Sequence, residues 1–385
     1  MNGTTHDHQF DPLPPWRAVV AAAVRAAYAW SKRHEQPGAM REAARMTGVL
    51  MAAHGPGRGP STPSELAKAL HRRLGDLPFL QDCPEAEAAE MILLENGQLT
   101  AAVYDLACEY SAPLGETIGR AAWLPTWTRM RADQIRQEAY AAMTATGRQE
   151  DYVASRKFLI EHPAGQFDAL REQLSSEGAK LAPYGYEKIP EDQLHRDRNS
   201  EAWWFPCPVC RWPMAVAADR VRCRYRPHSA SYRIRRKPVG TRPVLDRIDT
   251  GPRIATPKAA PAAGARCVNA GVWRFVVVPG AAELRLYRVL DKPGIDVELW
   301  PEADSYDLHV KVGEHEYRAD LKEYQSIGRL VDHLAATRPT AEVVLPVTHE
   351  HQLSALERAV LPGVRVTTET RFRTRILNLR RRANG

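Results

Sequence analysis

Two aspartates and a lysine near the C-terminal end have the types and spacing that can hold a divalent cation. In the stretch YRADLKEY, Asp320 and Lys322 are two positions apart, and twelve residues separate Asp307 from Asp320. Alternate side chains of a strand share one face, so Asp320 and Lys322 are expected to lie side by side. The apolar alternation of YDLHVKV, residues 306–312, places Asp307 on the polar face of a neighbouring strand. The sequence therefore predicts that these three side chains converge at one edge of a sheet.

Such a constellation suits the hydrolysis of a phosphodiester. Two carboxylates favour a hard cation such as Mg²⁺ or Mn²⁺, with the carbonyl of Leu321 as a further ligand and Glu283 as a carboxylate from the preceding helix. The cation would lower the pKa of a bound water and neutralise developing charge, while Lys322 orients the water and stabilises the pentavalent transition state. The predicted catalytic residues are Glu283, Asp307, Asp320 and Lys322. The alternative is a surface hairpin with an incidental ion pair, because Asp-x-Lys alone is frequent by chance.

Cysteine and histidine spacing predicts a second metal centre in EAWWFPCPVCRWPMAVAADRVRCRYRPH. Cys207 and Cys210 form a Cys-x2-Cys knuckle, and Cys223 follows after twelve residues. His228 follows after four more, which completes a tetrahedral set of zinc ligands. Cys267 is the alternative fourth ligand. Free thiols that happen to be close are the other interpretation, but a short basic segment has little core without a metal, which favours structural zinc.

Basic residues concentrate around this predicted zinc module. From Arg211 to Arg242 there are ten lysines or arginines and a single acid, Asp219. The interleaved aromatic residues are Trp212, Tyr225, His228 and Tyr232. Arginine and aromatic groups together suit phosphate contact and base stacking, although a like-charge run is otherwise typical of a solvated or disordered segment. We therefore expect DNA as a partner. The predicted DNA contacts are Arg224, Arg226, Arg233, Arg235, Arg236 and Lys237.

The composition predicts several globular domains. A chain of 385 residues with 44% hydrophobic residues is too long for one core of ordinary size. No run of eighteen apolar residues predicts a membrane span, and no secretory signal is recognised, so a cytoplasmic location is expected. Six cysteines do not make a disulfide scaffold. The net charge of +7 permits a nucleic-acid partner without requiring one.

The N-terminal half has the periodicity of helices. One spans residues 16–33, and another spans 63–77, where Thr62, Pro63 and Glu65 form a capping box with proline at the first helical position. The basic side of the second helix suits a DNA groove, but an amphipathic helix with a solvated face explains it as well. Further helices are predicted over residues 85–94, 98–110, 131–146, 150–160 and 165–176.

The C-terminal part alternates short apolar runs with helical periods. Strands are predicted over residues 272–279, 296–300, 306–312, 315–324, 341–348 and 364–368. Helices are predicted over 280–292, 326–337 and 349–360. This order predicts an α/β sandwich around a mixed sheet. The predicted domains are a helical N-terminal domain (1–125), a helical connecting domain (126–198), a zinc-binding basic module (199–236), a Pro/Ala/Gly-rich linker mostly without regular structure (237–268) and the α/β domain (269–385).

The pattern D-x12-D-x-K with a helical glutamate upstream resembles the PD-(D/E)xK nuclease superfamily, with Tyr306 where that family has the proline. The stretches WWFPCPVCRWPM, CRYRPHSASYR, VWRFVVVPGAAEL and YRADLK resemble restriction-endonuclease-like proteins associated with prokaryotic PIWI-RE modules, over residues 185–385. This resemblance implies defence against plasmids or phages beside a PIWI-RE Argonaute-like protein and a DinG-type helicase.

The leading hypothesis is thus a multidomain protein with a helical N-terminal half, a small zinc module and a C-terminal PD-(D/E)xK nuclease-like sandwich. It would cleave DNA with Mg²⁺ or Mn²⁺. A non-catalytic zinc-containing DNA-binding or scaffold subunit of the same kind of complex is the alternative. A zinc-bearing transcription regulator that uses the N-terminal helices is a third possibility, which leaves the acidic face unexplained.

Overall fold

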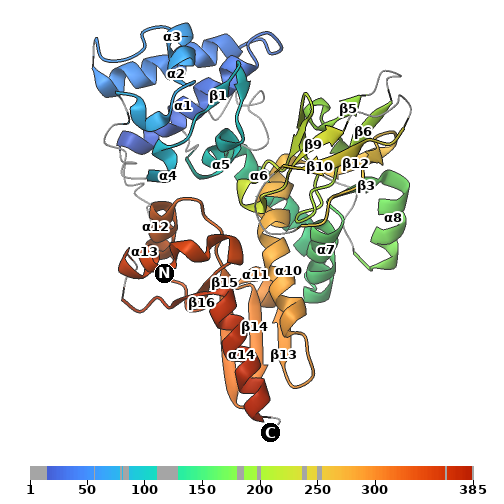
Figure 1. Cartoon of the computed structure of the whole chain (residues 1–385). Coiled ribbons are helices and arrows are strands. Elements are labelled where there is room, and N and C mark those ends of the chain that lie inside the picture. The colour runs from blue at the N-terminus through green and yellow to red at the C-terminus, as the bar shows by residue number, and fades with distance from the viewer. Residues whose placement is uncertain are drawn as a thin grey trace, which may run out of the picture. The chain divides into compact units, whose positions relative to one another are not determined.

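The computed structural model describes residues 15–55, 57–78, 80, 86–110, 129–179, 186–196, 201–235, 241–248, 254–359 and 362–383. The chain divides into two compact units, Met1–Trp123 and Leu124–Gly385. Within the described ranges, every helix is too short or too polar to cross a lipid bilayer. Figure 1 labels the elements of both units.

The first unit is mostly helical. Its elements are α1 (Pro15–Ser31), α2 (Ala39–His54), α3 (Pro63–Ala69), the 3-10 helix η1 (Leu74–Asp76), α4 (Ala86–Ala89), the hairpin β1 (Leu94–Glu95) and β2 (Gln98–Leu99), and α5 (Ala101–Tyr110). Buried alanines of α1 let α2 approach closely, and the buried Arg25 of α1 forms an ion pair with Glu42 of α2. Helix α2 is not among the predicted helices, because Thr47 and Gly48 weaken its propensity.

The capping box at α3 is confirmed in part. Thr62 Oγ1 accepts a hydrogen bond from the Glu65 N–H at 3.2 Å, but Glu65 Oε2 accepts from Ser61 instead of Thr62. The helix ends at Ala69, so the predicted extension to residue 77 is wrong. The predicted helices 85–94 and 98–110 are shorter as well, because the β1–β2 hairpin occupies residues between them.

The second unit begins with three helices close to those predicted. They are α6 (Arg129–Thr144), α7 (Gln149–Glu161) and α8 (Phe167–Ser176).

Three small sheets follow. Their strands are β3 (Ala164–Gln166), β4 (Tyr186–Lys188), β5 (His195–Arg196), β6 (Ala202–Trp204), β7 (Ala215–Ala217), β8 (Arg220–Arg222), β9 (Ser231–Arg235), β10 (Val244–Arg247), β11 (Ala260–Pro261) and β12 (Ala265–Val268). The sheet orders are β10-β9-β8-β7, β11-β6-β5 and β3-β12-β4. Strands β10, β11 and β12 lie within residues 237–268, so parts of the predicted linker pair into sheets, whereas the other described residues of that segment lie outside strands and helices. Buried Leu245, Cys267 and Val268 hold these strands in place.

Residues 272–279 are helical, and the predicted strand there is wrong. The segment consists of α9 (Ala270–Val272), a π-helical turn η5 (Trp273–Val277) and the start of α10 (Val278–Leu290). Asn269 caps it by accepting a hydrogen bond from Val272 N–H at 2.9 Å. A short apolar run does not distinguish a strand from a buried helix, and Val276, Val277 and Val278 are all buried here.

The C-terminal sheet is mixed, as the element order predicts. Its strands are β13 (Asp296–Leu299), β14 (Leu308–Val312), β15 (His315–Leu321), β16 (Glu342–Leu345) and β17 (Val366–Thr368), in that spatial order. The first three are antiparallel, whereas β15, β16 and β17 are parallel. The associated helices are α10, α11 (Pro301–Asp304), α12 (Ile327–Thr337), the 3-10 helix η6 (Val347–Gln352), α13 (Leu353–Ala359) and α14 (Glu369–Ala383).

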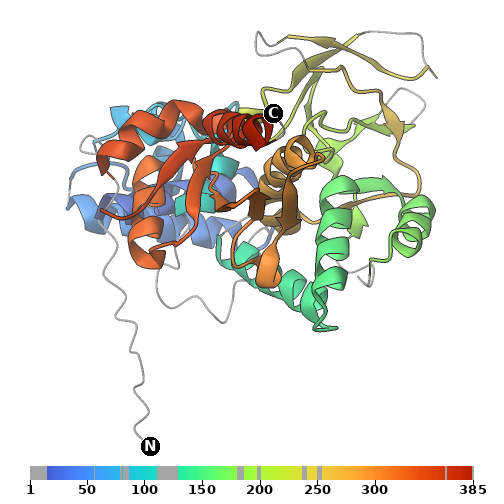
Figure 2. The ribbon, with the colours of Figure 1, turned by 90° about the horizontal axis from the view of Figure 1, so that it is seen from below.

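Helices cover both faces of this sheet. Leu330 and Leu334 of α12 and Leu356 of α13 pack against Val343 and Leu345 of β16. Arg375 of α14 pairs with Glu342, which points to the opposite face, and α10 runs beside α14 (Figures 1 and 2). The arginine-rich C-terminal stretch is therefore an amphipathic helix that buries Phe372 and Ile376.

Candidate active site and metal centre

Strands β14 and β15 bring Asp307, Asp320 and Lys322 together. The Asp307 N–H donates to Ala319 O at 3.1 Å, and Asp307 Oδ2 accepts from the Leu321 N–H at 2.5 Å. Lys322 Nζ donates to Asp320 Oδ1 at 2.6 Å. Asp307 directly precedes β14 and Lys322 directly follows β15, so the pairing of these strands brings the three residues near one another.

These groups are more deeply buried than a surface strand would place them. Asp307 is 6% exposed and Asp320 9% exposed. Burial raises the pKa of Asp307 well above its usual range, and the neighbouring Glu283 and Asp320 carboxylates raise it further. Burial alone would lower the pKa of Lys322, but Asp320 and Asp307 raise it. A cation bound there would favour the ionised form of Asp307.

Glu283 of α10 lies in the same buried region but has partners of its own. Its Oε2 accepts from Arg156 Nη2 at 2.9 Å and from Trp300 Nε1 at 2.5 Å. Arg156 belongs to α7, and its guanidinium also contacts Asp304 and stacks over the Trp300 indole. We call Glu283, Asp304, Asp307, Asp320, Arg156 and Lys322 the acidic cluster. Sequence reasoning misses Arg156 and Trp300, because nothing local relates positions so far apart in the chain.

The donor atoms of this cluster fit a hard divalent cation. Asp307, Asp320 and the Leu321 carbonyl offer only oxygen atoms, which is the ligand type that Mg²⁺ or Mn²⁺ prefers, with water completing the shell. Glu283 is turned toward Arg156, so its role as a direct ligand is not favoured by this geometry.

Cys207, Cys210, Cys223 and His228 form a compact buried cluster that could hold a metal ion such as zinc. Their ligand atoms all lie within 4.8 Å of one another. The Cys210 and Cys223 sulfurs are 3.9 Å apart, and His228 Nδ1 is 3.4 Å from Cys223 Sγ. A tetrahedral site with Zn–S bonds of about 2.3 Å requires sulfurs about 3.8 Å apart, so the spacing fits.

The proposed substitute ligand Cys267 does not belong to this cluster. It lies on β12, opposite Ala164 of β3 and Glu187 of β4. His228 therefore completes the set, as the spacing predicts. Among the described residues, the other group of similar compactness is Glu161, His162 and Glu177, where Glu161 already pairs with Arg288.

The Cys3His cluster packs against the C-terminal domain through aromatic contacts. Trp212 stacks on Trp273, with ring centroids 4.4 Å apart, and Trp273 Nε1 donates to Cys210 Sγ at 3.3 Å. On another side, Tyr225 Oη lies 3.4 Å from His349 Nε2 of η6. Burial lowers the pKa of His349 to about 3, so this imidazole is neutral.

Two family models match the chain. Residues 15–166 match the pPIWI_RE three-gene island domain Y, and residues 280–384 match the REase associating with pPIWI_RE. The chain is a PIWI-RE-associated protein with a restriction-endonuclease-like domain. No curated protein and no solved structure matches it. The matches include the N-terminal helices but not residues 167–279, which carry the Cys3His cluster and part of the resemblance seen in the sequence.

The restriction-endonuclease-like domain contains Glu283, Asp307, Asp320 and Lys322, whereas Arg156 lies in the domain Y match. The buried Arg156–Glu283 ion pair therefore joins the two matched regions. A nuclease-like role in defence follows from this domain and from the three-gene island that the models name.

The predicted DNA contacts divide into buried and exposed groups. Arg224 is buried, pairs with Asp192 and lies over the Trp212 ring, so its predicted role is not supported by its position. Arg226, Arg233 and Arg235 are exposed. Arg236 and Lys237 lie outside the described residues. Trp212, Tyr225, His228 and Tyr232 are buried, so the prediction that they stack on bases is wrong.

An exposed basic face nevertheless exists on strands β8 and β9. Arg220 lies opposite Arg233 in the antiparallel register, and the alternation of the strands places Arg222 and Arg235 on that face too. Asp219 and Asp246 lie beside Arg233 and Arg235. We call Arg220, Arg222, Arg233 and Arg235 the arginine face.

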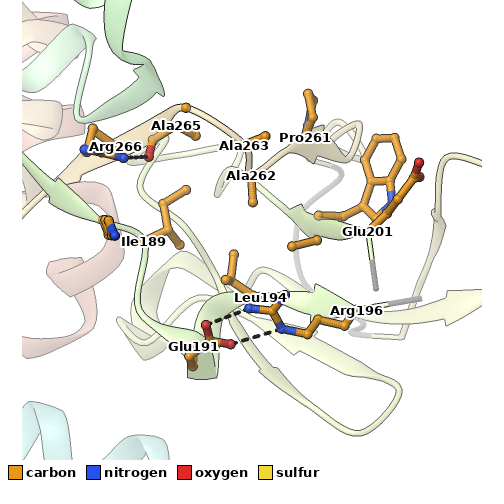
Figure 3. A pocket seen from close by; sticks show the side chains of 14 residues that line it. Ile189, Glu191, Leu194, Arg196, Glu201, Pro261, Ala262, Ala263, Ala265 and Arg266 are labelled. Carbon is orange, nitrogen blue, oxygen red and sulfur yellow. Dashed lines mark hydrogen bonds and ion pairs between the residues drawn. The ribbon is translucent and has the colours of Figure 1, made fainter. Parts of the chain in front are cut away.

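A pocket of about 590 Å³ lies beside β5, β6 and β11 (Figure 3). Its lining combines the Trp203 side chain with small residues such as Ala262 and Gly264. Glu191 and Arg196 pair across part of its edge, at 2.7 Å between Oε1 and Nη2. It includes none of the predicted site residues.

Proposed function

We propose that the protein is a divalent-metal-dependent DNA endonuclease of a PIWI-RE-type defence module. It hydrolyses phosphodiester bonds of invading plasmid or phage DNA. The observation that carries this proposal is the convergence of Asp307, Asp320 and Lys322 at the adjacent ends of β14 and β15, inside a restriction-endonuclease-like domain.

In this proposal each of the four predicted catalytic residues has a task. Asp307 and Asp320, with the Leu321 carbonyl, hold Mg²⁺ or Mn²⁺. When bound, the ion lowers the pKa of a water and stabilises charge on the phosphoryl oxygens. Lys322 pairs with Asp320 in this structure. In the reaction its ammonium group would also contact the attacking water and the scissile phosphate, which orients the water and stabilises the transition state. Glu283, held by Arg156, is the carboxylate that α10 contributes to the site.

The remaining parts of the chain position the substrate. Zinc at Cys207, Cys210, Cys223 and His228 holds the basic module in shape, because that module lacks a large core of its own. The arginine face contacts the phosphate backbone through charge and without base readout. A PIWI-RE Argonaute-like protein and a DinG-type helicase are the proposed partners, in keeping with the island that the family models name.

A non-catalytic subunit is the second candidate. The burial of the acidic cluster and the engagement of Glu283 by Arg156 favour it, since a substrate must reach Asp320 to be cut. Both candidates share the Cys3His cluster and DNA affinity, and they differ only in cleavage.

The test is incubation of the purified chain with plasmid and with single-stranded DNA. Cleavage is expected with Mg²⁺ or Mn²⁺ and none with EDTA. Because partner proteins can be required for activity, the assay is repeated with them present. No cleavage under any of these conditions would favour the non-catalytic candidate.

A further inference from the structure

Helix α7 contributes a buried arginine to the acidic cluster. Arg156 is 5% exposed, and its Nη2 donates to Glu283 Oε2 while its Nη1 donates to Tyr152 Oη, both at 2.9 Å. It also pairs with Asp304, and its Cζ lies 4.5 Å from the centroid of the Trp300 ring. Burying a guanidinium without partners is costly, so four contacts of this kind fix its position closely.

The sequence provides for this placement through a close helix contact. Gly280 of α10 faces Ile160 of α7, and a Cβ at position 280 would lie 2.3 Å from Ile160 Cδ1. Only glycine allows this approach without a shift of Ile160. Glu283 and Arg156 each lie about one helical turn from this contact point. The close approach of α7 and α10, which run side by side in Figure 1, therefore sets Arg156 opposite Glu283.

Arg156 engages two of the carboxylates of the acidic cluster. The carboxylates of this cluster are Glu283, Asp304, Asp307 and Asp320, and its cations are Arg156 and Lys322. Arg156 pairs with Glu283 and Asp304, which leaves Asp307 and Asp320 for a single bound divalent cation.

The geometry leads to the same number of ions. In sites with two metal ions, the ions lie about 3.5–4 Å apart and share carboxylates. Here the carboxylate above the sheet, Glu283, already accepts from Arg156 and from Trp300. Glu283 Oε2 is therefore engaged by the guanidinium and the indole, and a second ion would have to displace them to use it as a ligand.

We propose that Arg156 is a positioning residue that takes the place of a second metal ion, so that the site binds one divalent cation through Asp307 and Asp320. The inference rests on the proposed function, because it assumes that a divalent cation binds there. Glu283 and Asp304 then serve as counter-ions of Arg156. Helix α7, which lies outside the restriction-endonuclease-like match, becomes a necessary part of the site.

The test counts Mn²⁺ bound by the full-length chain, from the loss of the electron paramagnetic resonance signal of free Mn²⁺. Zinc is measured separately in the same samples. The wild-type chain is expected to bind one Mn²⁺, and Asp320→Asn to lose it, which locates the counted ion in the acidic cluster. If the wild-type chain binds two Mn²⁺ ions and Asp320→Asn loses both, the acidic cluster holds two ions, and the proposed role of Arg156 is overturned.

Two variants of the arginine form a matched pair. Arg156→Met removes the charge and is expected to raise the count from one Mn²⁺ to two, whereas Arg156→Lys keeps the charge and the count of one. A folded Arg156→Met that binds one Mn²⁺ with unchanged affinity contradicts the proposal. If Arg156→Met does not fold, which circular dichroism reveals, Arg156→Gln, which removes the charge but keeps a polar side chain, is counted in its place with the same two outcomes.

Cleavage assays on the same samples separate this inference from the proposed function. A chain that binds two Mn²⁺ and cleaves DNA overturns the role of Arg156 and leaves the nuclease standing. In the opposite case, the chain binds one Mn²⁺ at Asp320, Arg156→Met binds two, and no DNA is cleaved with the partners present. That result supports the role of Arg156 and overturns the proposed nuclease activity.

Discussion

Trp273 donates its indole N–H to Cys210 Sγ over 3.3 Å and so joins the Cys3His cluster to the helical segment that carries Glu283. Its ring also stacks on Trp212 at 4.4 Å. Trp273 begins the π-turn that continues directly into α10. Hydrogen bonds to ligand sulfurs orient metal ligands, so a metal held by the Cys3His cluster would be linked through one continuous helical segment to Glu283 of the acidic cluster. Loss of the first metal is therefore expected to loosen the second site.

The chain is expected to contain one zinc ion. Cys223→Ser removes a ligand from the cluster, so it should lose the zinc and lower the melting temperature. Cys267→Ser is the matched control, because Cys267 is equally buried but belongs to β12. Metal analysis of protein purified without added zinc gives the count. A folded wild-type chain free of zinc, or a Cys223→Ser variant that retains it, would show that the cluster is not a zinc site.

DNA binding is expected to depend on the arginine face. Replacing Arg220, Arg222, Arg233 and Arg235 together by Gln should weaken binding to all sequences alike. The slope of log affinity against log salt is negative, and each lost phosphate contact makes it shallower by about 0.9. The control neutralises four other exposed basic residues of the same unit, Lys157, Arg171, Arg338 and Arg358. Fluorescence anisotropy at several salt concentrations measures both. Equal losses in the two variants would mean that net charge, and not this face, determines affinity.

Stability is expected to fall in mild acid because of His349. Burial lowers its pKa from 6.5 to about 3, and nearby cationic groups, among them His351 and Arg274, lower it too. Below pH 6.5, His349 therefore binds a proton in the unfolded chain but stays neutral in the folded chain. The free energy of unfolding should decrease by up to about 1.4 kcal/mol per pH unit as the pH falls from that value.

Denaturant unfolding at pH 7 and pH 5 measures this slope. His349→Gln should reduce the dependence of the free energy of unfolding on pH. His351→Gln changes an exposed neighbour and should retain most of that dependence. If the wild type and His349→Gln have the same slope, the histidine is not the group responsible.

Spacing in the sequence predicted the Cys3His cluster and the contact between Asp320 and Lys322. Lys322 directly follows the last residue of β15, so the extended chain places it beside Asp320. The four ligands of the Cys3His cluster lie within a short segment, and their spacing is a property of the sequence. The mixed sheet also follows from the order of elements.

The rest depends on contacts that no local pattern encodes. Arg156 reaches Glu283 only because Gly280 lets α7 approach α10. The valines of residues 276–278 favour a strand by propensity, but burial on all sides and the Asn269 cap make them helical. In residues 241–268, the pairing of short strands with distant partners overrides a composition typical of linkers.

The central claim is that Asp320 holds a catalytic metal, and one comparison tests it most directly. Cleavage of plasmid DNA with Mn²⁺ is measured for the wild type, Asp320→Asn and Glu316→Gln, with partner proteins present. Glu316 is an exposed acid on the same strand, paired with His309. We expect Asp320→Asn to fold, to bind DNA and to lose about a thousandfold or more of the cleavage rate, because a metal ligand is gone. Glu316→Gln should cleave like the wild type. Wild-type cleavage by Asp320→Asn, in protein free of contaminating nuclease, would contradict the account.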